Sequence, residues 1–227
     1  MRNLVITALL LVTISGCEAL EWSDVKTWPG IENGEGGTLG ALGCSMTRDL
    51  FDPGLSRNSV VPGWRKLSPS GAKVLKSYSG GTLLRWAEGN NIKWAAFEAG
   101  DAGWPDTFAI LWQICIQEEE VIANPNDYLD ELAYIANRIQ QESPGVPIYV
   151  TGMPRYTGGH VCYIAGPDGV EFSHTLAALA AQSTPAILAD GLELGPFSAS
   201  QTKDGCHVTA AGAAIEAAQL EAWILAL

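Results

Sequence analysis

The chain has 227 residues, of which 47% are hydrophobic and 17% are charged, so its composition is that of a globular protein and excludes an intrinsically disordered one. The formal net charge of −12 argues against nucleic acid as a partner, because such a surface repels a phosphate backbone. The length fits a single domain with a sizeable core.

Residues 1–16 are predicted to form a signal peptide. Arg2 precedes an apolar run from Leu4 to Ile14 that is too short to remain in a bilayer as a spanning helix. The run ends in Ile14-Ser15-Gly16-Cys17, which resembles the bacterial lipobox, in which the cysteine is lipid-modified and becomes the mature N-terminus. We therefore expect an exported lipoprotein anchored in the cell envelope through Cys17. The alternative is an ordinary cleaved signal and a secreted or periplasmic product.

Residues 17–37, which contain several glycines and acidic residues, are expected to tether the anchor to one domain over residues 38–227. Within that domain, apolar runs alternate with helical patterns. Strands are predicted at 38–42, 74–78, 107–116, 146–151 and 192–194, and helices at 91–100, 125–141, 174–182 and 209–227. Segments 48–71 and 155–173 are expected to be irregular. The alternation predicts an open α/β sheet with parallel strands, in which the nearly continuous apolar run at 107–116 is a central strand.

The residues with the clearest chemical potential follow strands or precede the last helix. In open α/β sheets, ligands bind beyond the carboxyl ends of the strands, and Ser45, Gly80, Gln117, Asp204 and His207 would all fall at that edge. An aspartate three residues before a histidine can fix the tautomer of the imidazole and stabilise its charged form, so the histidine can act as a general base. The well-placed nucleophile for this base is Ser45.

These segments, in this order, resemble the SGNH hydrolase superfamily of GDSL-type esterases and lipases. The resemblance implies a flavodoxin-like three-layer α/β/α sandwich with a central, mostly parallel five-stranded sheet. The matching blocks are Gly43–Thr47 with Ser45 as nucleophile, Ser79–Thr82 with Gly80, Cys115–Glu118 with Gln117, and Asp204–His207. Two blocks depart from the family pattern: Cys44 replaces the aspartate of the first block, and in the third Cys115 and Gln117 replace a glycine and an asparagine.

The resemblance implies a serine esterase that acts on short-chain acyl or acetyl esters of small molecules or glycans through a Ser45–His207–Asp204 triad. The backbone N–H groups of Ser45 and Gly80 and the side chain of Gln117 would form the oxyanion hole. This chemistry requires no cofactor, and we expect a monomer. The altered third block leaves an alternative open, namely a catalytically silent SGNH-like surface domain that binds glycans or proteins.

Four cysteines remain besides Cys17, and an even number in an exported protein favours disulfides, which four cysteines can form in three ways. The alternative is four buried free thiols. The chain has no Cys-x-x-Cys and no histidines with zinc-ligand spacing, so we expect no metal site. In the strand order that the resemblance implies, the first and third strands are neighbours. We therefore expect the pairs Cys44–Cys115 and Cys162–Cys206, of which the second would fix the Asp204–His207 loop.

Overall fold

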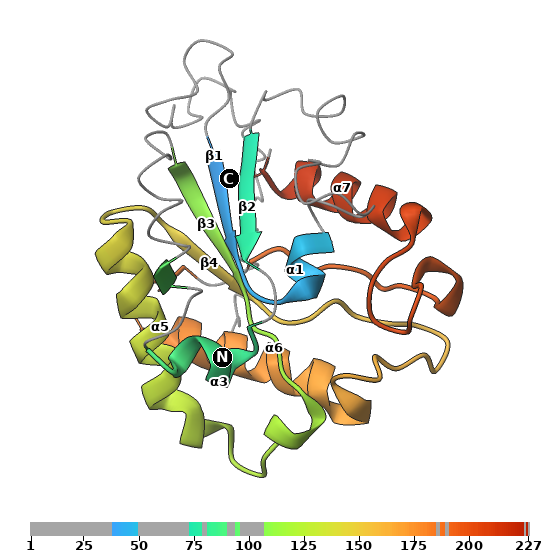
Figure 1. Cartoon of the computed structure of the whole chain (residues 1–227), viewed down its shortest axis with the longest axis horizontal. Helices are drawn as coiled ribbons and strands as arrows, with labels where there is room; N and C mark the ends of the chain where they lie inside the picture. Colours follow the sequence, from blue (N-terminus) through green and yellow to red (C-terminus); the bar gives the residue numbers. More distant parts are fainter. Residues whose placement is uncertain are drawn as a thin grey trace, which may run out of the picture.

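The computed structural model describes residues 38–49, 73–78, 81–89, 94–95, 107–184, 187–188, 191–224 and 226 (Figure 1). The predicted signal peptide, Cys17, the tether and Gly80 lie outside these residues, and so does most of the helix predicted at 91–100.

The described strands form one parallel sheet, as predicted. They are β1 (Thr38–Leu42), β2 (Lys73–Tyr78), β3 (Thr107–Gln113), β4 (Ile148–Thr151) and β5 (Ile187–Leu188), in the spatial order β2-β1-β3-β4-β5. Every neighbouring pair is parallel, so all carboxyl ends lie at one edge of the sheet.

The two largest errors in the predicted strands concern the last strand and the central strand. The last strand is β5 at Ile187–Leu188, whereas 192–194 is not a strand. The central strand ends at Gln113 and does not reach residue 116. Beyond that point the Cys115 carbonyl accepts a hydrogen bond from the N–H of Leu83 at 2.9 Å, so this part of the chain pairs with the segment after β2 instead.

The described helices are α1 (Ser45–Asp49), α3 (Leu83–Ala87), α5 (Leu129–Glu142), α6 (Gly166–Ser183) and α7 (Ala210–Ile224). Short 3-10 helices span Glu118–Glu120 (η2), Pro125–Tyr128 (η3) and Ala199–Gln201 (η4). The prediction that 155–173 is irregular is wrong for its second half, because α6 begins at Gly166, well before residue 174. Gly166 has a φ of 69°, Pro167 follows at the first helical turn and Asp168 adds an acidic side chain there.

Helices cover both faces of the sheet, so the fold has three layers (Figure 1). Alternate residues of each strand point to opposite faces. On one face, Leu42, Ile110, Trp112, Ile148 and Val150 share a core with residues of α3, α5 and α6. On the other, Leu39, Ala41, Leu111 and Tyr149 share a core with Ala213, Ala217 and Leu220 of α7. Within the residues that the structure describes, we find no helix with the length and apolar character needed to span a membrane.

Candidate active site

The structure brings Ser45, His207 and Asp204 into one hydrogen-bonded array, although Ser45 and His207 are 162 positions apart in the sequence. Nε2 of His207 lies 2.7 Å from Oγ of Ser45, and Nδ1 lies 2.6 Å from Oδ2 of Asp204. A carboxylate can only accept hydrogen bonds, so Nδ1 carries the proton and Nε2 is left to accept from the Ser45 hydroxyl. This is the geometry that a general base and its nucleophile require.

The loop before α7 presents Asp204 and His207 in a fixed relation. Oδ1 of Asp204 accepts the backbone N–H groups of Cys206 at 3.2 Å and His207 at 2.8 Å, and Gly205 between them has a φ of 87°. Burial alone would raise the pKa of Asp204, but the hydrogen bonds from His207 and Cys206 outweigh it and hold that pKa below its ordinary value. Asp204 is therefore ionised at neutral pH and able to orient the imidazole.

The turn that carries Ser45 is held from inside the protein. The Cys44 N–H donates to Oγ1 of Thr47 at 3.1 Å, and the Thr47 hydroxyl donates to Oε1 of Gln113 at 2.6 Å. On the other side, Nε1 of Trp86 donates to the Gly43 carbonyl at 3.0 Å. A Cβ at Gly43 would lie 2.1 Å from Oγ1 of Thr47, so only glycine fits against this network.

Sequence reasoning missed these supporting residues. Thr47 and Gln113 are both almost fully buried, and Trp86 reaches the turn from α3. The sequence does indicate such a network at Gln113, which is a single amide within an otherwise apolar stretch of strand. A buried polar side chain of this kind needs a hydrogen-bond partner.

A cavity of about 120 Å³ opens beside Ser45. It is lined by Cys44, Ser45, Met46, Thr82, Cys115, Ile116, Gln117 and Ile164. Larger cavities of about 480 and 430 Å³ lie elsewhere, one lined by residues of α3 and α5 and the other beside His174. Because neither of these is lined by Ser45, His207 or Asp204, the small cavity is the candidate binding site.

Gln117 lines this cavity and is largely exposed, and its side chain also caps the short helix η2. Its backbone N–H donates to Oε2 of Glu120 at 2.7 Å, while Oε1 of the same buried carboxylate accepts the Thr82 hydroxyl at 2.7 Å. Glu120 thus joins the segment after β3 to the segment after β2, the two stretches from which Gln117 and Gly80 were expected to contribute oxyanion donors. The donor roles of Ser45, Gly80 and Gln117 stay predictions, since Gly80 is outside the described residues.

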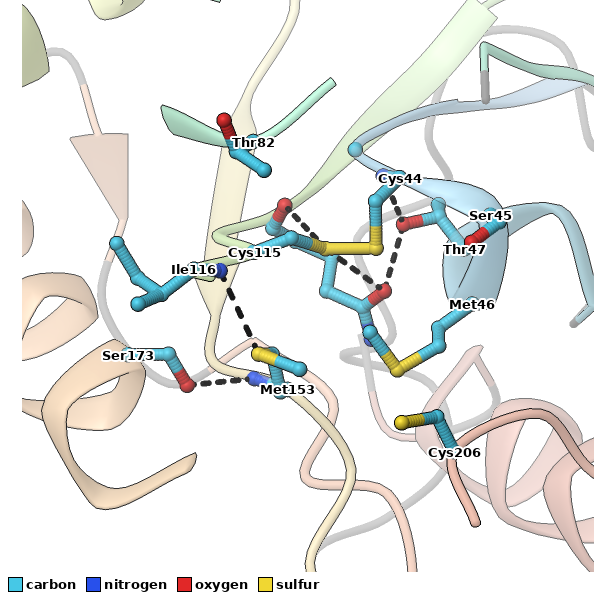
Figure 2. The surroundings of a disulfide bond; sticks show 12 residues. Cys44, Ser45, Met46, Thr47, Thr82, Cys115, Ile116, Met153, Ser173 and Cys206 are labelled. Atoms are coloured by element: carbon cyan, nitrogen blue, oxygen red, sulfur yellow. Dashed lines mark hydrogen bonds between the residues drawn. A yellow bond between two sulfur atoms is a disulfide. The ribbon is translucent and has the colours of Figure 1, made fainter. Parts of the chain in front are cut away.

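Both expected disulfides are present, Cys44–Cys115 and Cys162–Cys206. Figure 2 shows the first, which joins the turn before Ser45 to the end of β3. The second joins the segment after β4 to the residue that precedes His207. Disulfides persist in oxidising compartments, so these pairs indicate a location outside the cytoplasm.

The other two histidines make no hydrogen bond to Ser45, His207 or Asp204 among the described residues. Nε2 of His160 lies 3.1 Å from the hydroxyl of Thr202. His174 lies on α6, where Nε2 is 2.9 Å from the Met153 carbonyl and therefore donates to it. Burial first, and then the charge of Arg155, lowers the pKa of His174, so this ring is neutral at physiological pH.

No family model matches the chain, and no curated protein matches it. Solved structures of esterases do. A carbohydrate acetylesterase from Sinorhizobium meliloti superposes with a TM-score of 0.54 at 12% identity, covering 84% of this chain and 99% of its own. A family 3 carbohydrate esterase from Talaromyces cellulolyticus gives 0.53 at 13%, covering 84% and 97%. A GDSL-like lipase from Bacteroides thetaiotaomicron gives 0.51 at 16%, covering 84% and 89%. At these identities the likeness shows a shared α/β fold with a parallel sheet, the fold that the SGNH resemblance implied.

Proposed function

We propose that this protein is an exported serine esterase that removes short acyl groups, acetyl above all, from carbohydrate esters. The observation that supports this proposal is the continuous hydrogen-bond chain from Asp204 through His207 to Ser45, which ends beside a cavity. The fold that the chain shares with carbohydrate esterases adds support from a second direction.

In the proposed reaction, Nε2 of His207 takes the Ser45 proton while Oγ attacks the ester carbonyl. Asp204 stabilises the imidazolium that results. The oxyanion of the tetrahedral intermediate receives hydrogen bonds from the N–H groups of Ser45 and Gly80 and from the amide of Gln117. Each such donor contributes about 3–4 kcal/mol to the transition state. His207 then protonates the leaving alcohol, and the acyl-enzyme is hydrolysed by a water molecule that His207 activates.

The cavity beside Ser45 is small, about 120 Å³ against about 480 and 430 Å³ for the two cavities elsewhere, and this favours a short acyl group such as acetyl over a fatty-acyl chain. Its lining of sulfur atoms, methyl groups and the Ile164 side chain suits a small apolar group.

Anchoring of the enzyme in the cell envelope through a lipidated Cys17 is part of the same proposal, and a Cys17→Ala variant that no longer partitions into detergent would support it.

A catalytically silent surface domain is the second candidate. It is favoured by the third block, where Gln117 stands in place of an asparagine and its side chain caps η2. In that case the array of Ser45, His207 and Asp204 would be retained without turnover, and the cavity would serve binding alone.

Hydrolysis of p-nitrophenyl acetate by the wild type, Ser45→Ala and the matched control Ser183→Ala separates the two candidates, since Ser183 is exposed at the end of α6 and distant in sequence from the array. We expect Ser45→Ala to lower kcat by about 10⁴-fold or more and Ser183→Ala to leave it unchanged. A fluorophosphonate probe should label the wild type at Ser45 in peptide mass spectrometry. Equal rates for all three proteins, with no label at Ser45, would refute the esterase proposal.

A further inference from the structure

A short segment beside the candidate active site, residues 156–164, is held in place by a disulfide and by two side-chain hydrogen bonds. The Cys162–Cys206 disulfide joins it to the loop of His207. The Tyr156 hydroxyl donates to the Cys206 carbonyl at 3.0 Å, and the His160 ring bonds the Thr202 hydroxyl. Residues 156–164, which we call the disulfide segment, therefore have a fixed position relative to Asp204 and His207.

This segment exposes two apolar side chains to solvent. Tyr163 is 64% exposed and Val161 is 42% exposed, the two highest values among the exposed large hydrophobic side chains of the described residues. Cys162 between them is fully buried. An exposed aromatic ring adds little to the free energy of folding, because it buries little apolar surface. A ring whose backbone is already fixed, however, binds a ligand at little cost in conformational entropy.

Tyr163 lies next to the loop that carries Asp204 and His207. Its Cδ1 atom is 3.4 Å from the position that a Cβ would take at Gly205, in the loop of Asp204 and His207. The next residue, Ile164, lines the cavity beside Ser45, and its carbonyl accepts the Glu118 N–H at 2.9 Å. The Tyr163 ring thus lies next to the His207 loop, and the residue that follows it in the chain lines the cavity beside Ser45.

In the proposed reaction the acyl group enters the small cavity, and the alcohol leaves on the side of His207, which gives it a proton. We propose that Tyr163, with Val161 beside it, forms the subsite for the sugar ring of that alcohol. This inference rests on the proposed function and specifies its substrate. A pyranose presents a face of C–H groups that packs on an aromatic ring. The net charge of −12 favours a neutral sugar over an acidic one.

The test compares two substrates, p-nitrophenyl acetate and acetylated xylo-oligosaccharide, for the wild type, Tyr163→Ala, Tyr163→Phe and the control Tyr134→Ala on α5, which removes another exposed tyrosine. We expect Tyr163→Ala to lower kcat/KM for the oligosaccharide about five- to tenfold and to leave p-nitrophenyl acetate within about twofold. Tyr163→Phe and Tyr134→Ala should stay within about twofold on both. An equal loss on both substrates, or no loss on either, would overturn the proposal.

Calorimetry with unacetylated xylohexaose keeps this inference separate from the proposed function, because it needs no turnover. Binding to Ser45→Ala that is lost in Ser45→Ala/Tyr163→Ala supports the subsite even if the wild type proves inactive on every ester. Equal binding by the two variants, or no binding by either, overturns it even if the esterase activity is established.

Discussion

Replacement of Thr47 by valine tests whether the buried network behind the turn that carries Ser45 holds that turn in place. Valine matches threonine in shape but has no hydroxyl, so the change leaves the Cys44 N–H and Oε1 of Gln113 buried without their partner (Figure 2). Each orphaned buried group costs about 1–3 kcal/mol. The extra methyl offsets part of this, so we expect the free energy of unfolding to fall by about 3 kcal/mol and kcat to fall about tenfold or more as Ser45 shifts.

Urea unfolding at 25 °C and p-nitrophenyl acetate hydrolysis measure the two effects, with Thr175→Val as the control, because the Thr175 hydroxyl bonds only an exposed helix carbonyl. Gln113→Met and the double variant complete a cycle. Since the double variant removes both partners, it should be about 1–2 kcal/mol more stable than the sum of the single losses predicts. A loss below about 0.5 kcal/mol for Thr47→Val, or strict additivity in the cycle, would refute the reasoning.

Two further predictions concern the disulfide segment and α6. The Cys162–Cys206 crosslink spans 44 residues, so its removal by a double change to serine should cost about 4 kcal/mol of stability in the loop-entropy model and lower the melting temperature by about 10 °C. We expect kcat to fall more than substrate affinity does. A melting temperature within about 2 °C of the wild type would contradict this. The pKa of His174 is lower in the folded protein than its ordinary 6.5, so the folded state binds fewer protons there. Stability should consequently fall as the pH drops below about 6.5, by at most about 1.4 kcal/mol per pH unit, and His174→Gln should flatten that slope in urea titrations at pH 5 to 7; identical slopes for the two proteins would show that burial of His174 plays no such part.

The prediction that the site residues lie together rested on a rule of the fold. Ligands bind beyond the carboxyl ends of parallel strands, so Ser45, after β1, and His207, before α7, were expected at that edge, and their side chains lie 2.7 Å apart. Prediction failed where the chemistry is not local. The hydrogen bond between Thr47 of α1 and Gln113 of β3 joins two segments of the chain that neither periodicity nor a motif connects.

The prediction of the fold failed for different reasons. β5 is only two residues long, and no alternation is visible in so short a strand. The start of α6 was missed at Gly166-Pro167-Asp168, although these are helix-start residues, because glycines and prolines in the preceding segment favoured a loop. In each case the sequence pattern was weaker than the packing that fixes the element.

The two disulfides each fix one half of the array and do not join the halves. Cys44 precedes Ser45, and Cys206 precedes His207, but their partners lie in other segments. Among the described residues, Tyr156 also crosses between the halves: its hydroxyl donates to the Cys206 carbonyl at 3.0 Å and lies 3.7 Å from Sδ of Met46.

Tyr156→Phe keeps the ring and removes that hydroxyl, so it should leave the Cys206 carbonyl short of one hydrogen bond and cost about 1 kcal/mol of stability. If Tyr156 aligns the halves, kcat should fall by more than the small stability loss implies, about tenfold, with KM little changed, because the loss affects the proton transfer between Ser45 and His207 and not substrate binding. Tyr134→Phe, which alters an exposed ring on α5, provides the control. If Tyr156→Phe matches the wild type in kcat while losing the expected stability, Tyr156 serves packing alone, and the hydrogen bond between Ser45 and His207 is sufficient to align the two halves.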